Sequence, residues 1–374
     1  MIRETQEMKT YPYGHDFGNT DTDGVLVKNG QQNKSSIPTA FLRADVNAIN
    51  NLGVKKEDAK NMHIIQLKDD IPFAFGDLAL SQGVKIWNGR GDDRRYASKY
   101  SIMAIITGAG NLTEDKEFKL FVVTGIPADL FISNPELRKE IKTTLDGSYT
   151  FTLDGGKTWR ICHIEIETVV MEGAGALMSE ESINGNGKDK NAECAVIDIG
   201  GGTIDLYAQR NGIPMTEFCK NDHLAVETAA EIMRSELENK YRSLSAIEVR
   251  EIMYAYASTD KKKKYPALYH NGNLIPPEVL EAATHQGVVQ VANDIISFVS
   301  ASWRQAGGAS RFKPVLCIGG GKFFFFEYLK KRIPHLTAPD DPVHANARGY
   351  ATKAAQRLAQ RLAKKNKELA AEGK

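Results

Sequence analysis

The feature that most constrains this chain is a glycine-rich turn between two short apolar runs. The first run, 195–199, contains Asp198; Gly200, Gly201, Gly202 and Thr203 follow, and Asp205 lies in the second run, 204–208. This pattern predicts a strand, a tight turn and a second strand. Glycines in series let a ligand approach the backbone closely, and their N–H groups form a nest for anions. With a carboxylate that can hold Mg²⁺ through water, the turn predicts a seat for a metal–polyphosphate. The alternative is a plain hairpin turn whose aspartate serves solubility.

Two further segments repeat parts of this pattern. In 13–27, Asp16 precedes a short polar stretch of Gly18, Asn19 and Thr20, and an apolar strand follows. In 315–322, an apolar strand ends in Gly319, Gly320 and Gly321, and a helix-like run covers 323–332. No Gly-Lys-Ser/Thr closes a phosphate loop, and the G-x-G-x-x-G spacing is absent. The three turns therefore form a constellation different from both of those nucleotide motifs.

The order DFGNT, DIGGGTID, IGGGK resembles the actin/sugar-kinase/heat-shock-chaperone ATPase superfamily over roughly residues 11–355. The resemblance implies an α/β, actin-like (ribonuclease H-like) duplicated two-domain fold with a central nucleotide cleft. It implies a domain I at 11–180 plus 340–374, with a small inserted subdomain at about 36–97. Domain II would cover 190–339, with an inserted subdomain at about 220–285.

The same resemblance assigns roles in the cleft, where Asp16 and Asp198 would face each other and hold Mg²⁺ largely through water. ATP or GTP would be the bound nucleotide. Its phosphates would bind the backbone amides of two turns, one formed by Gly18, Asn19 and Thr20 and the other by Gly200, Gly201, Gly202 and Thr203. Its nucleoside would lie against the third turn, formed by Gly319, Gly320 and Gly321. Asp205 would position water or metal, or simply close its hairpin.

Glu172 is the best candidate for orienting the attacking water. It follows a β-branched strand and precedes the Gly-Ala-Gly-Ala start of a helix, and a glutamate in this setting polarises water in the plasmid-segregation branch. The alternative role is an acid that complements the helix dipole. One departure stands out: conventional actins carry a phosphate-contacting lysine after the first turn, where this chain has Asp23 by direct count. Its nearest lysine, Lys28, lies further along the hairpin.

Composition narrows the function classes. A length of 374 residues with 42% hydrophobic residues allows two domains with real cores. A net charge of +1 gives no global field for nucleic acid or membrane, so no direct nucleic-acid binding is expected. Four widely spaced cysteines suggest reduced thiols, and the polar N-terminus shows no signal peptide. No run of eighteen apolar residues occurs, and we expect a cytoplasmic protein.

Three further segments resemble the ParM-like plasmid-segregation actins: 124–127, 172–176 and 345–350. This resemblance implies an ATPase that assembles head to tail into filaments, which weaken after hydrolysis. It also implies DNA segregation through a DNA-binding adaptor protein. The absence of a substrate-binding domain after the core argues against a chaperone. A monomeric sugar- or acetate-type kinase remains the main alternative, and a nucleotide-gated scaffold that does not polymerise is another.

Apolar spacing and turn residues predict the main elements. Helices are expected at 98–109, 134–145 with Asn134 as its N-cap, 222–241, 276–306 and 343–372. Strands are expected at 37–41, 71–76, 119–125, 149–153 and 159–170. The segment 182–190 should be a loop, 261–264 a solvated turn, and the basic tail from Lys364 a frayed helix end. The run Phe323–Phe326 predicts a helix packed between neighbours, or one or two rings at a subunit contact.

Overall fold

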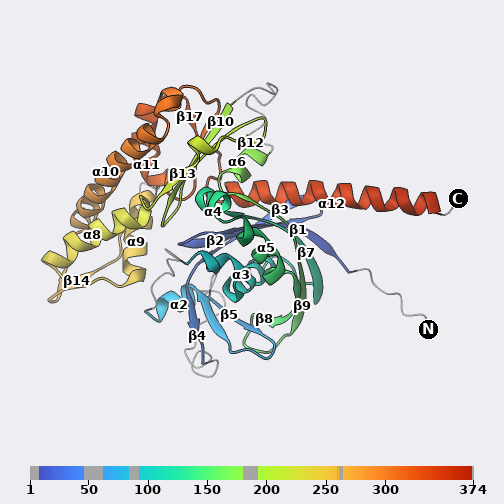
Figure 1. Ribbon diagram of the computed structural model, residues 1–374. Helices are drawn as coiled ribbons and strands as arrows, with labels where there is room; N and C mark the ends of the chain where they lie inside the picture. The colour runs from blue at the N-terminus through green and yellow to red at the C-terminus, as the bar shows by residue number, and fades with distance from the viewer. Residues whose placement is uncertain are drawn as a thin grey trace.

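The computed structural model describes residues 8–45, 62–83, 92–179, 193–258, 260 and 264–372 (Figure 1). The predicted loop at 182–190 lies outside these residues, as do the first three lysines of the predicted turn at 261–264. Two sheets form the centres of the molecule, and helices pack on them. The α/β class predicted from the sequence is confirmed.

The first sheet has nine strands in the order β3-β2-β1-β7-β9-β8-β5-β6-β4. Its centre is built from β1 (Thr10–Phe17), β2 (Asp21–Lys28), β3 (Gln31–Pro38), β7 (Glu117–Ile126), β8 (Gly147–Thr152) and β9 (Arg160–Met171). The strands β1 to β3 form an antiparallel meander, while β7 and β9 run parallel to β1. The strands predicted at 119–125, 149–153 and 159–170 are thereby confirmed within two residues.

The segment predicted as an inserted subdomain extends this sheet. It contributes β4 (Phe41–Arg43), β5 (Met62–Leu67), β6 (Phe73–Gly76), α2 (Asp77–Ser81) and the 3₁₀ turn η2 (Asp93–Ala97). Because β5 pairs with β8, its strands continue the sheet and do not form a separate one. The single strand predicted at 37–41 is wrong: β3 ends at Pro38, and β4 begins at Phe41. Proline has no N–H with which to continue the ladder.

The second sheet repeats the beginning of the first. It contains β10 (Glu193–Ile199), β11 (Ile204–Arg210), β12 (Ile213–Pro214), β13 (Lys220–Asp222), β16 (Val315–Ile318) and β17 (Leu336–Thr337). The antiparallel hairpin β10–β11 is followed by β16, which runs parallel to β10, as β1–β2 is followed by β7. This repeat agrees with the predicted duplication.

The helices of the first half are α3 (Lys99–Gly110), α4 (Ala128–Ser133), α5 (Pro135–Leu145) and α6 (Ala174–Met178). Those of the second half are α8 (Val226–Lys240), α9 (Ala246–Ala257), α10 (Pro277–Ser302) and α11 (Lys322–Arg332), with the short elements η3 (Thr216–Phe218), η4 (Arg304–Ala309), β14 (Tyr269–His270) and β15 (Asn273–Leu274). The helices predicted at 98–109 and 134–145 are confirmed, and Asn134 caps the latter by accepting from the Leu137 amide at 3.2 Å.

Two predicted helix ends are wrong. The helix predicted at 222–241 begins only at Val226, because 220–222 pairs with β11 as a strand. The helix predicted to reach 306 ends at Ser302, where the chain turns into η4. Gly307 and Gly308 have positive φ there, a conformation that a continuing helix excludes.

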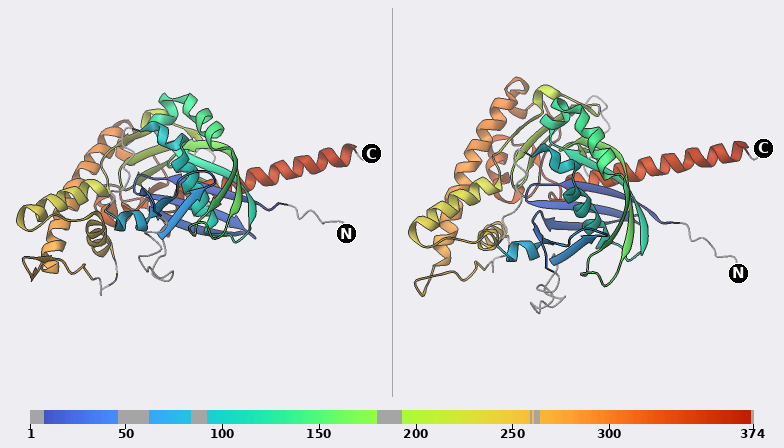
Figure 2. Two further views of the ribbon diagram at one scale, coloured as in Figure 1. Left: turned by 90° about the horizontal axis from the view of Figure 1, so that it is seen from below. Right: turned by 60° about the horizontal axis from the view of Figure 1, so that its bottom comes forward.

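The last helix, α12 (Ala345–Glu372), packs on the first sheet and then leaves it (Figure 2). Tyr350, Ala351 and Ala354 are fully buried, whereas residues 359–371 are exposed on every side. The predicted helix at 343–372 is confirmed.

None of the helices in the described residues is long and apolar enough to cross a bilayer. All four cysteines are free thiols.

Candidate functional site

The two hairpins of the repeat share one register. In the first, Asp16 lies opposite Asp23, and Phe17 and Thr22 close a turn of residues 18–21. In the second, Asp198 lies opposite Asp205, and Ile199 and Ile204 close a turn of residues 200–203. Each hairpin therefore presents two carboxyls at the base of a turn of equal length. Asp23 is the counterpart of Asp205.

The two turns meet face to face. A Cβ atom added to Gly201 would lie 1.4 Å from Oγ1 of Thr20, and one added to Gly202 would lie 2.9 Å from Cβ of Asn19. Only glycine leaves room for the turns to approach this closely. Residues predicted from separate motifs as two halves of a phosphate seat therefore lie side by side.

The third glycine run lies against the end of β10. Gly319 has φ +78° and donates its N–H to the Pro342 carbonyl at 2.9 Å, and a Cβ on it would lie 2.3 Å from the Ile199 carbonyl oxygen. Gly321 donates to that same oxygen at 2.8 Å. The run joins the start of α11 to the second hairpin.

A cavity of about 530 Å³ opens between the two sheets. The predicted residues that line it are Asp16, Gly18, Asn19, Thr20, Glu172, Asp198, Gly200, Gly201, Gly202, Thr203, Asp205, Gly319 and Gly320. Gly321 is the exception, because its contacts turn it toward β10. One space thus collects predicted residues that are up to 304 positions apart in sequence, from Asp16 to Gly320.

Sequence reasoning missed several residues of the cavity wall. They are Arg95 from η2, Glu231 and Arg234 from α8, Arg250 and Tyr254 from α9, Phe323 from α11 and Asn346 from α12. Asn346 lies in the segment 345–350, which had been noticed only as similar to a family. Phe323 follows the third glycine motif but was expected only in the core or at a subunit contact. The others lie outside the glycine motifs, and no spacing to those motifs marks them.

Four carboxyls in the cavity carry strongly altered proton affinities. Burial, countered in part by Asn346 and Arg95, raises the pKa of Asp16 to about 6. Burial raises the pKa of Asp205 to about 7. Burial and then repulsion from neighbouring carboxylates raise the pKa values of Glu172 and Asp198 well above their usual range. A cation bound among these carboxyls would favour their ionised form and offset their mutual repulsion.

The donor set fits a hydrated Mg²⁺. One oxygen of Asp205, Oδ1, is buried without a hydrogen-bond partner. Within the described residues, no three His, Cys, Asp or Glu side chains form a group that would hold a metal directly. Mg²⁺ keeps several waters and takes only one or two carboxylates, so Asp16 and Asp198 would hold it through water.

Asn346 contacts the first aspartate of the second hairpin. Its Nδ2 donates to Oδ2 of Asp198 at 2.7 Å, and Asn346 also limits the rise in the pKa of Asp16. Its Oδ1 accepts from the Gly173 amide at 3.1 Å. Gly173 has φ +83° and follows Glu172, whose own N–H donates to Ile126 at 2.9 Å. One amide therefore fixes Asp198 and the backbone beside the glutamate.

The phenylalanine run divides between the core and the cavity. Phe325 is buried, and Phe324 and Phe326 pack against the core of the second half. Phe324 stacks on Tyr256 with the ring planes 4° apart. Phe323 is 46% exposed and lines the cavity. The predicted packing of this helix between neighbours thus holds for three of the four rings.

Neither of the residues considered for the missing lysine supplies a cation here. Lys28 pairs with Gln31 at the far end of the β2–β3 hairpin and does not line the cavity. Asp23 lines it but is buried, and burial raises its pKa to about 8. The cationic side chains in the cavity wall are Arg95, Arg234 and Arg250.

Comparisons with known proteins agree with this architecture. Residues 14–175 match the family "Actin like proteins N terminal domain". No functionally curated protein matches the sequence. A ParM from Clostridium botulinum, solved as a 15-stranded filament, superposes with a TM-score of 0.73 at 20% identity, over 93% of this chain and 100% of that one. A non-polymerisable quadruple mutant of pCBH ParM gives a TM-score of 0.72 at 20% identity, with the same coverage.

An archaeal actin homologue, Ta0583, is also similar, with a TM-score of 0.69 at 19% identity over 94% of this chain and 100% of that one; it was solved in complex with ADP. The fold is therefore shared across the whole length of these proteins. Residues 14–175 thus match the N-terminal domain of actin-like proteins, and the chain as a whole has an actin-like fold, with ParM plasmid-segregation actins and an archaeal actin homologue as structural neighbours.

Proposed function

We propose that this protein binds ATP or GTP with Mg²⁺ in the cavity, hydrolyses the nucleotide, and assembles head to tail into filaments. The observation that carries the nucleotide site is the pair of matched hairpins, which set two glycine-containing turns and two pairs of aspartates around one cavity. We further propose domains at 11–180 with 340–374 and at 190–339, so that the cavity lies between them.

The chain's own residues have distinct tasks in this proposal. Backbone N–H groups of both turns, 18–20 and 200–203, hold phosphate oxygens. Gly319 and Gly320 let the nucleotide lie against the backbone, and Asp16 and Asp198 hold Mg²⁺ through water. When bound, Mg²⁺ would supply positive charge beside the phosphates.

Glu172 is the proposed water-orienting residue. Its carboxyl lines the cavity together with the two aspartate pairs, and burial raises its pKa well above the usual range. A carboxylate with a raised pKa is a stronger base than an ordinary glutamate. Phosphoryl transfer depends mainly on positioning and charge, so one oriented water is enough to complete the site.

Filament assembly and DNA segregation through an adaptor protein rest on likeness of fold. The two ParM structures described above share this fold, and one of them was solved as a filament. A head-to-tail contact joins two different surfaces and therefore generates open filaments. The adaptor would link the filament to DNA.

Glu172→Gln tests the hydrolytic part, because it removes the base but keeps the shape of the side chain. We expect phosphate release to fall about 10²- to 10⁴-fold, nucleotide affinity to be retained, and ATP-dependent pelleting to last longer. Glu140→Gln, on the exposed face of α5, is the matched control and should behave as wild type. Unchanged phosphate release in Glu172→Gln would remove Glu172 from this role.

Light scattering and sedimentation with and without ATP test assembly. Nucleotide-dependent pelleting without any phosphate acceptor supports the filament. A monomer that turns over ATP only when a sugar or an acid is added would refute it and identify a small-molecule kinase.

A further inference from the structure

Arg95 is a buried cation in the wall of the cavity. It lies in η2, just before α3, and only 5% of it is exposed. Its neighbour Arg94 points to solvent. Of two successive arginines, the fold thus buries one beside the predicted phosphate turns and leaves the other outside.

The guanidinium of Arg95 is held in a fixed orientation. Its Nη1 donates to Oδ1 of Asn19 in the first turn at 2.5 Å, and its Nη2 donates to the Tyr96 hydroxyl at 2.5 Å. It lies over the Tyr96 ring at 4.5 Å and near the Phe17 ring at 5.8 Å. The Arg95 carbonyl accepts from the hydroxyls of Ser98 and Ser101 at 2.6 and 2.8 Å, which fixes the backbone. The group is therefore preorganised.

Arg95 has spare donors and no close counterion. Among the residues that the structure describes, no carboxylate forms an ion pair with it. Arginine carries five N–H donors, and these two hydrogen bonds leave others unused. A buried charge without a counterion is costly, and phosphate matches the planar guanidinium well.

Arg95 remains protonated inside the protein. Burial would lower its pKa, but Tyr96 and the carboxyls of Glu172 and Asp205 outweigh that effect and raise it. The guanidinium therefore lies close enough to Glu172, the proposed water-orienting residue, to interact with it electrostatically.

The other two arginines of the cavity are less suited to this task. Arg250 already forms an ion pair with Asp21 at 2.7 Å. Arg234 lines the cavity from α8, one turn after Glu231. Among the described residues, Arg95 is therefore the cavity arginine that contacts a side chain of a proposed phosphate turn and forms no ion pair with a carboxylate.

We infer that Arg95 binds the terminal phosphate of a nucleoside triphosphate and takes the place of the lysine that conventional actins carry in their first hairpin. This inference rests on the proposed nucleotide function. Its location beside Asn19 and Glu172 predicts that it distinguishes a triphosphate from a diphosphate.

Binding of a non-hydrolysable ATP analogue and of ADP to Arg95→Met, Arg95→Lys and Arg94→Met tests this inference. Arg95→Met should weaken binding of the analogue about 10- to 100-fold, as expected for a lost hydrogen bond to a charged group, and should leave ADP binding nearly unchanged. Arg95→Lys should recover part of the loss, because lysine keeps the charge without the fork. Arg94→Met should match wild type.

Thermal unfolding without nucleotide separates binding from structure. Arg95→Met removes a buried charge but also the hydrogen bonds to Asn19 and Tyr96, so the melting temperature should change little. A lower melting temperature with equal losses for the analogue and ADP would assign Arg95 a structural role and overturn the inference. Wild-type protein that binds neither ligand would refute the proposed function itself, whereas tight binding that Arg95→Met leaves intact would refute only the role of Arg95.

Discussion

At the scale of single residues, buried acids determine how this protein responds to pH. Burial raises the pKa values of Asp16 to about 6, Asp205 to about 7 and Asp23 to about 8. In an unfolded chain these groups titrate near pH 4. Between about pH 4 and pH 8 the folded state therefore binds more protons than the unfolded state. The free energy of unfolding without ligand should fall as pH rises through this window, which urea denaturation at pH 5, 6, 7 and 8 would measure.

Asp23→Asn isolates one member of this group. Oδ1 of Asp23 is buried without a hydrogen-bond partner, and Nε2 of His344 lies 3.8 Å from it. Asparagine keeps the shape without the charge, so the free energy of unfolding at pH 8 should rise by about 1–3 kcal/mol. Asp294→Asn, on the exposed face of α10, is the control and should keep the wild-type slope. A wild-type slope in Asp23→Asn would show that Asp23 does not contribute.

At the scale of elements, one ion pair links α9 of the second half to the turn of residues 18–21 in the first hairpin. Arg250 donates to Asp21 at 2.7 Å, and the two side chains are only 15% and 25% exposed. The Arg250 guanidinium also lies over the Tyr254 ring at 4.8 Å. This contact spans the cavity and holds its two walls together.

Arg250→Met should therefore speed nucleotide release. Loss of a partly buried charged hydrogen bond corresponds to a release rate about 10- to 100-fold higher, measurable by stopped-flow chase of a fluorescent nucleotide. The control is Arg242→Met, which breaks the pair with Glu248 at 2.5 Å inside the second half. Arg242→Met should lower stability without changing release. Equal release rates for both variants and wild type would mean that Arg250 does not hold the cavity closed.

The two hairpins of the cavity could be predicted because each depends on residues that are close together in the sequence. The hairpin around Gly200–Gly202 needed only two apolar runs and a glycine turn, and its partner around Gly18 carries the same pattern. Arg95 and Asn346 could not be found this way. Arg95 is 76 positions from the Asn19 side chain that it contacts, and Asn346 is 148 positions from Asp198. Their roles arise only when the sheets bring distant segments together.

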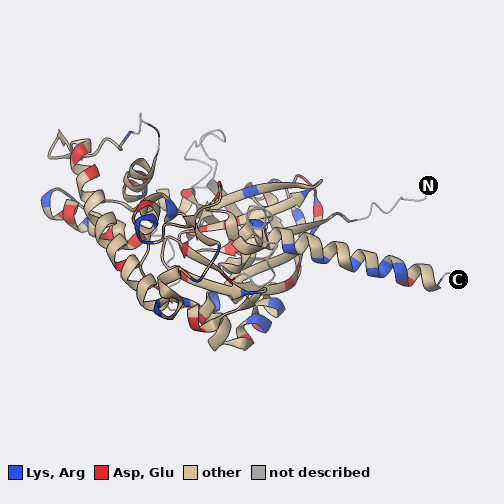
Figure 3. Ribbon diagram, turned by 90° about the horizontal axis from the view of Figure 1, so that it is seen from above, with Lys and Arg blue, Asp and Glu red and all other residues tan. Residues whose placement is uncertain are grey.

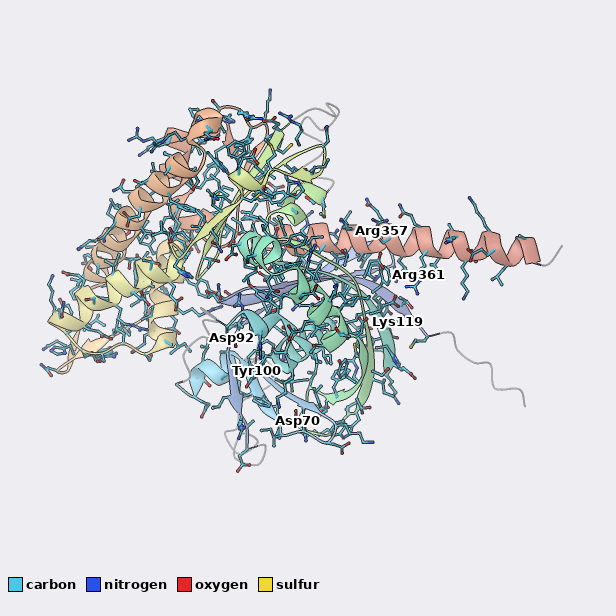
Figure 4. All side chains as sticks on the ribbon, viewed as in Figure 1. Asp70, Asp92, Tyr100, Lys119, Arg357 and Arg361 are labelled. Carbon is cyan, nitrogen blue, oxygen red and sulfur yellow. The ribbon has the colours of Figure 1, made fainter. Side chains whose placement is uncertain are left out.

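At the scale of the whole molecule, α12 has two parts with different environments. Its first turns pack on the sheet, and its last described ion pair with the body joins Arg361 to Glu165, which also binds Lys119 at 2.5 Å. Figure 4 labels Arg357, Arg361 and Lys119 where the helix leaves the sheet. Beyond this point the helix extends alone, and Figure 3 shows its series of basic residues. The outer part contributes nothing to either core.

Truncation before Leu362 should therefore leave the fold intact. Leu362 and Leu369, the large apolar residues of this part, are 52% and 56% exposed, so their removal uncovers no buried surface. The free energy of unfolding should change by less than about 0.5 kcal/mol, and nucleotide affinity should stay the same. Tyr350→Ala, a fully buried position on the same helix, should instead cost about 3–5 kcal/mol. Urea denaturation of both variants measures this contrast. A comparable loss on truncation would mean that the projecting turns pack against the body in solution, because an exposed helix end has no other means of stabilising a monomer.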